Sequence, residues 1–127
     1  MIELLIKILI ISFFINLLYE LLHSLLYKTC IEAPLPKYVY LILKAAVFDG
    51  VSITLIYSIS YFAFKNYSIF IFSAISIAFA YFWEIYSIKE GRWEYTSKMP
   101  KIFGVGLTPT FQLFITGFLS IYLSIKF

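Results

Sequence analysis

The sequence predicts an all-α membrane protein, a bundle of four transmembrane helices in up-down order. Composition is the first reason, because 62% of the 127 residues are hydrophobic and only 13% are charged, unlike an ordinary soluble domain. Length is the second reason, because about 20 apolar residues cross a bilayer and about four such crossings fit. We therefore expect a single transmembrane domain over residues 1–127, with helices at about 2–27, 38–64, 67–87 and 108–125.

The first helix carries a polar stripe. The run is longer than the core of a signal peptide and no small-residue cleavage site follows it, so we expect a retained helix that ends before the Pro34 and Pro36 pair. Polar residues recur within it at spacings of three and four, which puts them on one face that should turn toward protein and away from lipid. They are Ser12, Asn16, Glu20, His23, Ser24 and Tyr27.

The second and third helices also have one distinctive face each, on either side of a tight turn at Lys65 and Asn66. On the second helix, Lys44 is close enough to the surface to extend toward it, whereas Asp49 lies about 16 Å from the helix start at 1.5 Å per residue. The face of Asp49 continues through Ser52, Ile56 and Ser60. The third helix has a stripe of small residues that would allow close helix packing. Its members are Ser73, Ser76, Ala80 and Ser87, with Glu84 near the end.

The fourth helix is predicted to begin at Thr108 or Pro109. Thr108 is a suitable N-cap and Pro109 suits the first helical position. One face of this helix then carries Gln112, Thr116, Ser120 and Ser124. We expect this face to pack against the other helices.

Basic residues fall unevenly on the two sides of the predicted bundle. Lys28, Lys37, Lys89, Arg92, Lys98 and Lys101 lie in the first and third connections, with Lys44 close by, and only Lys7, Lys65 and Lys126 lie on the other side. By the positive-inside rule, loops 28–37 and 88–107 face the cytoplasm and both termini face outward. The dispersed net charge of +3 argues against a nucleic-acid partner.

The strongest polar groups of all four helices fall in the same half of the membrane. Glu20 and His23 lie in the last turns of the first helix, and Asp49 lies in the matching half of the second. Glu84 and Gln112 lie at the end of the third helix and the start of the fourth. Unpaired ionisable groups cost about 2.5–3.5 kcal/mol each in the hydrocarbon, which favours one shared pocket.

Each polar residue also has a simpler interpretation. Glu20 and His23 would serve as a structural pair, Asp49 would neutralise Lys44, and Glu84 would reach Arg92 or Lys89 at the interface. Gln112 would tie the fourth helix to its neighbours, and Trp93 and Tyr95 would belong to an aromatic belt. The separate interpretations do not explain why these groups converge.

The sequence lacks several kinds of catalytic motif. It has no nucleophile elbow, no phosphate-binding glycine loop and no acidic pair spaced for Mg²⁺ and diphosphate. With a single histidine, His23, and a single cysteine, Cys30, we expect no metal site, no cofactor and no intrachain disulfide. The charged form of a carboxyl group is disfavoured in an apolar cavity, so such a group can donate a proton near neutral pH.

Residues 84–112 carry a run that begins E-x5-E-G-R-W-E-Y, continues with Met99-Pro100 and ends with G-V-G-L-T-P-T-F-Q. This run resembles the corresponding segment of small integral-membrane proteins of the lycopene cyclase and carotenoid hydratase type. It is also similar to short prokaryotic four-helix membrane proteins with G-R-W-x-Y and M-P signatures, which implies a prokaryotic plasma membrane. The resemblance covers about a quarter of the chain. It implies a site near the membrane face built by Glu84, Trp93, Tyr95, Pro109 and Gln112.

The sequence departs from the cyclase pattern directly after the proline. That pattern favours paired acidic residues, and Thr110, Phe111 and Gln112 stand here instead. The departure puts cyclisation itself in question.

Our leading functional hypothesis is an enzyme, or a lipid-binding enzyme subunit, that acts on an isoprenoid or other membrane lipid by acid–base chemistry. It would be an isomerase, cyclase or hydratase-like protein. Glu20 and Glu84 would be proton donor or base, and His23 and Asp49 would orient them. The substrate would contact Arg92, Trp93, Glu94, Tyr95 and Gln112.

Two other functions fit the same sequence. A small proton or cation transport subunit would use Glu20, Asp49 and Glu84 as a relay, since carboxyl groups within the membrane are typical of relays too. A structural or assembly subunit would need none of them for chemistry. Homo-oligomers or a larger membrane partner are compatible with each of these functions.

Overall fold

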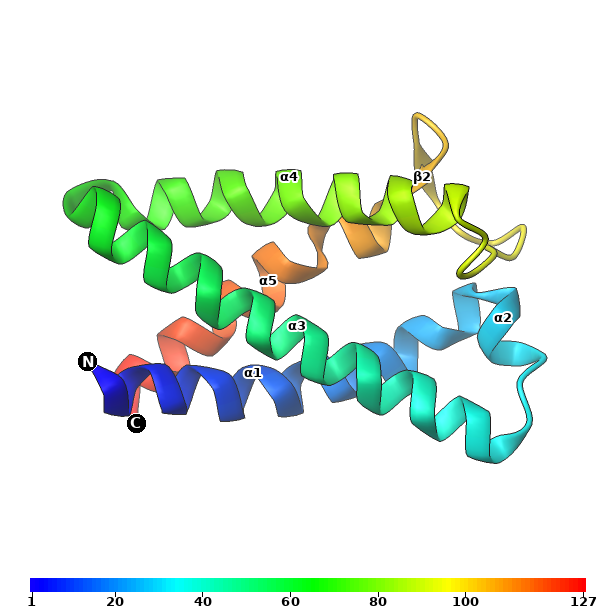
Figure 1. The fold of residues 1–127 in the computed structure, drawn as a ribbon, viewed down its shortest axis with the longest axis horizontal. Helices are drawn as coiled ribbons and strands as arrows, with labels where there is room; N and C mark the ends of the chain where they lie inside the picture. Colours follow the sequence, from blue (N-terminus) through cyan, green and yellow to red (C-terminus); the bar gives the residue numbers. More distant parts are fainter.

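The computed structural model describes residues 1–127 and is almost entirely helical. Four long helices are joined by short helical turns and one small β-hairpin (Figure 1). The elements are α1 (Ile2–His23), η1 (Ser24–Leu26), α2 (Lys28–Ile31), α3 (Leu35–Phe64), η2 (Lys65–Tyr67), α4 (Ser68–Lys89), β1 (Lys101–Ile102), β2 (Val105–Gly106) and α5 (Leu107–Lys126). The all-α prediction is confirmed.

Three helical stretches are long and apolar enough to span a membrane. They are Ile2–Leu26, Leu35–Lys89 and Leu107–Lys126. The middle stretch has 55 residues, more than twice what one crossing needs. It comprises α3 and α4, which are joined at η2, where Lys65 has the positive φ angle of 21°.

The four long helices pack against one another, except that α1 and α4 make no extensive contact. α1 and α4 each pack against α3 and α5, and α3 makes a smaller contact with α5. Both chain termini lie at the same end of the molecule as η2, whereas α2 and the β-hairpin lie at the opposite end (Figure 1). α3 and α4 meet at η2 and diverge toward the end that carries α2 (Figure 1).

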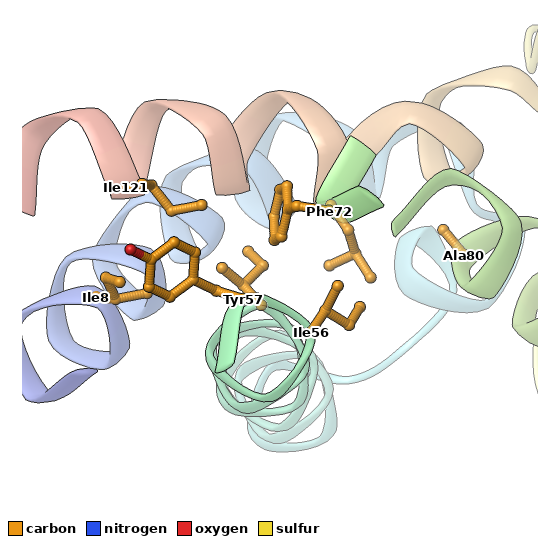
Figure 2. Packing of buried hydrophobic residues seen from close by; sticks show 8 residues of the cluster. Ile8, Ile56, Tyr57, Phe72, Ala80 and Ile121 are labelled. Atoms are coloured by element: carbon orange, nitrogen blue, oxygen red, sulfur yellow. The ribbon is translucent and has the colours of Figure 1, made fainter. Parts of the chain in front are cut away.

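The hydrophobic core lies between all four long helices, in the half of the molecule nearer to η2. Figure 2 shows Ile8 of α1, Tyr57 of α3, Phe72 of α4 and Ile121 of α5 gathered together. Phe72 is fully buried, and a Cβ atom at Gly117 of α5 would lie 2.5 Å from its ring. Only glycine at position 117 therefore allows α4 and α5 to approach this closely.

The polar faces predicted from helical spacing are buried as expected, with two exceptions. The buried set includes Ser12, Asn16, Ser60, Ser76, Ser87, Thr116, Ser120 and Ser124. Glu20 and Ser73 are the exceptions, since both are only half-buried, and the Ser73 hydroxyl donates to the carbonyl of Ile69. Phe72 takes the buried position at that level of α4.

Three boundaries differ from the prediction. α3 begins at Leu35 and not at residue 38, because Pro36 fits the first turn, where no amide donor is needed. The predicted end of the first helix is interrupted at η1, and the separate short helix α2 follows. The N-cap assignment of Thr108 is wrong, because α5 begins at Leu107 with Gly106 before it and no side-chain cap.

The β-hairpin between α4 and α5 was not predicted. Lys101 pairs with Gly106 and Ile102 with Val105, around a turn at Phe103 and Gly104. Both turn residues have positive φ angles, 52° and 81°, the pattern of a type I′ turn. Phe103 is 93% exposed, so the hairpin presents an aromatic side chain at its tip.

Candidate functional site

A cavity of about 490 Å³ lies where α3 and α4 diverge. Its walls come from α1, α2, α3, α4, α5 and the loop after α4. Ala80 and Leu113 belong both to the cavity wall and to the hydrophobic core, so the core closes the inner end of the cavity. Eight of the predicted site residues line it, namely Glu20, His23, Asp49, Glu84, Arg92, Trp93, Pro109 and Gln112.

Gln112 is the centre of one polar cluster. Its Nε2 atom donates to Glu20 Oε1 at 2.7 Å and to Asp49 Oδ2 at 2.8 Å, and it lies 3.1 Å from Asn16 Oδ1. One amide group from α5 therefore holds two carboxyl groups, from α1 and α3, side by side. An amide nitrogen has only two hydrogens for these three acceptors.

The third acceptor has another donor. Thr116 Oγ1 lies 3.0 Å from Asn16 Oδ1, and Asn16 itself donates to the backbone carbonyl of Ser12. Both side chains are buried. Asn16 and Thr116 thus extend the Gln112 cluster toward the core. Beyond them, the hydroxyl groups of Ser120 and Ser124 bond only within α5.

His23 is held on both sides of its ring. Its Nε2 atom lies 2.6 Å from Thr108 Oγ1, and its Nδ1 atom lies 3.8 Å from Glu20 Oε2. The rings of Tyr19 and Tyr27 approach it edge to face. Because Nδ1 is buried and makes no shorter hydrogen bond, its nearest polar neighbour is the Glu20 carboxyl group, as the structural-pair interpretation requires.

Glu84 is the centre of a second polar cluster, built from aromatic residues. Its Oε1 atom accepts hydrogen bonds from Tyr27 at 2.7 Å, Trp93 Nε1 at 3.0 Å and Tyr95 at 2.7 Å. No lysine or arginine lies within 4.0 Å of this carboxylate, so the predicted pairing with Arg92 or Lys89 is not present.

The loop after α4 is fixed to the end of α1 by these same residues. Tyr27 and Tyr95 form a β-bridge, in which Lys28 N donates to Glu94 O and Thr96 N donates to Leu26 O, both at 2.9 Å. The Tyr95 hydroxyl also accepts from Gly106 N at 2.9 Å. Burial raises the pKa of Tyr95 well above its usual value, and the hydrogen bond with Glu84 adds to this effect.

An aromatic stack forms the outer wall of the cavity. Phe48 of α3 stacks on Trp83 of α4 with ring centroids 4.9 Å apart, and Phe79 lies parallel to Trp83 at 6.2 Å. The Arg92 guanidinium lies 5.1 Å from the Trp83 ring. These side chains connect α3 and α4 where the two helices diverge.

Two predicted site residues lie outside the cavity lining. Glu94 is exposed, and its carboxylate lies 3.9 Å from Lys28 Nζ. Tyr95 reaches the site only through its hydrogen bond to Glu84. The expected contact of Glu94 with a substrate is therefore not supported by its position, because its backbone, and not its side chain, holds the loop.

Sequence reasoning missed several residues of the site. Tyr27 was assigned to the polar stripe but not to the site, and Phe48, Phe79 and Trp83 were not singled out. Helical spacing could have identified two of them. Phe79 lies four positions before Trp83, and Trp83 directly precedes Glu84, so both aromatic residues lie near the face of α4 that carries Glu84. Lys44 lines the cavity too, but the suggested ion pair with Asp49 is not formed.

The structure contains no group of three or more His, Cys, Asp or Glu side chains arranged to hold a metal ion. Cys30 is a free thiol at the edge of the cavity. Comparison of the chain with protein-family models, with curated proteins and with solved structures finds no match. The function must therefore be argued from the cavity itself.

Proposed function

We propose that this protein is a four-helix transmembrane protein that binds an isoprenoid or other membrane lipid and acts on it by acid–base chemistry. One observation carries the proposal: Glu20, Asp49 and Glu84 line a single cavity whose outer wall is aromatic and lies between two apolar helices. A hydrocarbon chain suits such a wall, and the carboxyl groups supply the reactive end.

The arrangement of the chain supports four crossings in up-down order. The 55-residue apolar stretch that contains α3 and α4 turns back on itself at η2, so α3 and α4 would each cross once. The hairpin and α2 share one end of the molecule (Figure 1), and the basic loop residues belong to that end. By the positive-inside rule it faces the cytoplasm, with both termini outside.

Glu20 and Asp49 are our candidates for the proton donor. Two carboxylates on one amide group repel each other in an apolar cavity, and one proton held between them removes the repulsion. Gln112 fixes their geometry, and His23 sits beside Glu20. The pair therefore behaves as one unit that can give a proton and take it back.

Glu84 has a different role in this proposal. Three donors converge on one of its oxygens and hold the carboxyl group in place. A fixed carboxylate and the faces of Trp83 and Phe48 would stabilise a cation that forms in the cavity. This assignment separates the proton donor from the charge that stabilises the intermediate.

The simplest reaction that these groups allow is isomerisation of a double bond. A proton from the Glu20–Asp49 pair adds to one alkene carbon, the electron pair of the double bond forms the new C–H bond, and the other carbon becomes cationic. Loss of a neighbouring proton to the same carboxyl pair forms the new double bond and restores the pair. The resemblance of residues 84–112 to carotenoid-modifying proteins is the reason for naming an isoprenoid.

The one-sided polarity of the molecule favours this function over a proton relay. A relay needs polar groups that connect both faces of the membrane, whereas here an apolar cluster that includes Ile8, Tyr57, Phe72 and Ile121 (Figure 2) packs between the helices on the η2 side of the cavity. The hydroxyl groups of Ser120 and Ser124 do extend into that half. Each of them donates to the backbone carbonyl four residues earlier, so their hydrogen bonds stay within α5.

The proposal is tested by deuterium exchange. Protein purified with its own lipids, and protein supplied with lycopene, would be incubated in D₂O, and the deuterium content of the lipids measured by mass spectrometry. We expect incorporation at alkene positions by the native protein. Glu20→Gln and Asp49→Asn should each lower it by about 100-fold or more, the usual contribution of a general acid.

Glu94→Gln is the matched control, because Glu94 is a carboxylate of the same chain that lies outside the cavity. It should exchange like the native protein. If no lipid gained deuterium and vesicles showed a proton leak that depends on Asp49, the enzyme assignment would be wrong and the proton relay would be supported. Absence of both activities would leave the assembly role.

A further inference from the structure

Two cationic side chains line the same cavity as the three carboxyl groups and remain unpaired. Lys44 comes from α3 and Arg92 from the loop after α4, and both are exposed. The ion pairs of the molecule are Lys7–Glu3, His23–Glu20 and Lys28–Glu94. The cavity thus has acidic groups among its buried residues and free cations at its exposed edge.

Aromatic rings hold these cations without using their hydrogen-bond donors. The Arg92 guanidinium lies 5.1 Å from the Trp83 ring and 5.3 Å from the Tyr86 ring, and Lys44 Nζ lies 5.7 Å from the Tyr40 ring. Neither side chain donates a hydrogen bond to another protein group. A guanidinium in this state has a planar set of N–H groups free for a bidentate anion.

We propose that the cavity takes a lipid with a phosphate head group, which Arg92 and Lys44 bind at the edge while the hydrocarbon chain passes inward along Phe48 and Phe79. This inference rests on the proposed function and narrows its substrate class. Glu20, Asp49 and Glu84 repel an anion from the interior, so the phosphate stays outside and the chain meets the carboxyl pair. A membrane phospholipid and a prenyl phosphate share this head-group chemistry.

The two tryptophans of the chain make the test direct, because Trp83 and Trp93 both line the cavity. Brominated lipids quench tryptophan fluorescence on contact. The protein would be reconstituted with brominated phosphatidylglycerol or with a brominated diglycosyl diacylglycerol, which has identical chains but no phosphate, and quenching measured against mole fraction. We expect phosphatidylglycerol to quench at about a 25-fold lower mole fraction, since each of the two basic side chains near an anionic lipid contributes about 1 kcal/mol.

Arg92→Gln and Lys44→Gln should each lower the ratio of the two mole fractions by about fivefold. The ratio is taken within each variant, which cancels any change in the emission of Trp83. Lys98→Gln is the control, because Lys98 is an exposed lysine of the same loop that lies outside the cavity, and it should keep the native ratio. Farnesyl phosphate, but not farnesol, should relieve the quenching if a prenyl phosphate is the natural occupant, whereas relief by neither points to the phospholipid.

Equal quenching by the two brominated lipids in the native protein would overturn the phosphate head group. If deuterium exchange still occurred, the proposed function would stand without it. A native preference that Lys98→Gln lowers as much as Arg92→Gln would also overturn the inference, because the preference would then reflect the charged surface and not the cavity.

Discussion

The Nε2 atom of Gln112 lies 2.8 Å from Oδ2 of Asp49, and this contact connects the first turns of α5 to the middle of α3. The two residues are 63 positions apart in the sequence. The same nitrogen contacts Glu20 of α1, so a single amide group joins three helices at the floor of the cavity. Removal of that group should therefore affect both stability and chemistry.

Gln112→Leu keeps a side chain of similar size but removes both donors. We expect a loss of about 1–3 kcal/mol in the free energy of unfolding, because buried carboxyl groups are left without a partner. Unfolding in mixed detergent micelles measures the change. Ser124→Ala on the same helix is the control, because its hydroxyl bonds only to the carbonyl of Ser120. If Ser124→Ala lost as much stability as Gln112→Leu, the contacts of Gln112 with Glu20 and Asp49 would not be what stabilises the bundle.

Glu84→Ala should loosen the loop after α4 without unfolding the bundle. The substitution leaves the donors of Tyr27, Trp93 and Tyr95 without their shared acceptor. Hydrogen exchange followed by mass spectrometry should show faster exchange at the amides of Thr96 and Gly106. In Glu90→Ala, an exposed position at the end of the same helix, exchange at these amides should stay at the native rate.

Stability should fall at alkaline pH through Tyr95. The pKa of this tyrosine is raised in the folded protein above its ordinary value of 10.0, so above pH 10 the unfolded chain loses a proton that the folded protein keeps. The free energy of unfolding is therefore constant in this respect below pH 10 and decreases as the pH rises beyond it.

Thermal unfolding between pH 8 and pH 11 measures this effect. Tyr95→Phe should be less stable at pH 8, since it loses the hydrogen bond to Glu84, but its midpoint should change less between pH 8 and pH 11. An equal alkaline slope in the two proteins would show that another group controls it. Tyr122→Phe, an exposed tyrosine near the C-terminus, should keep the native slope.

Gly117→Ala should destabilise the packing of α4 on α5. The added Cβ would lie 2.5 Å from the ring of Phe72, so the helices must move apart, at a cost of about 1–3 kcal/mol. Phe72→Leu in the same chain removes the clash and should restore part of the loss. A double variant no more stable than Gly117→Ala would mean that the ring does not cause the effect.

Helical spacing was enough to predict the long helices and most of their buried faces. Asn16 and Gln112 come from helices whose polar residues recur every three or four positions, and such a face in an apolar helix must turn inward. This reasoning brought Glu20, Asp49 and Gln112 to one level of the bundle. It could not show that one amide group would hold both carboxyl groups, because that depends on helix rotation.

The parts that sequence reasoning missed depend on contacts between distant segments. Glu84 obtains two of its donors from the loop at Trp93 and Tyr95, which has no periodic pattern, and the third from Tyr27, whose place on the polar face of the first helix does not identify its partner. Thr108 has a suitable side chain for an N-cap, but its hydroxyl is used by His23 instead. The hairpin was missed because Phe103 occupies a turn position that usually takes asparagine or glycine.

α3 and α4 are joined at η2, at the end of both helices that lies farthest from the cavity. A small change in the angle between them at η2 would therefore produce a larger displacement at the cavity. α4 has 22 residues and is therefore about 33 Å long. A tilt of about 5° at the joint would move the other end by about 3 Å, close to the thickness of an aromatic ring. The fit of Phe72 against Gly117, near the joint, thus bears on the contact between Phe48 of α3 and Trp83 of α4 at the other end.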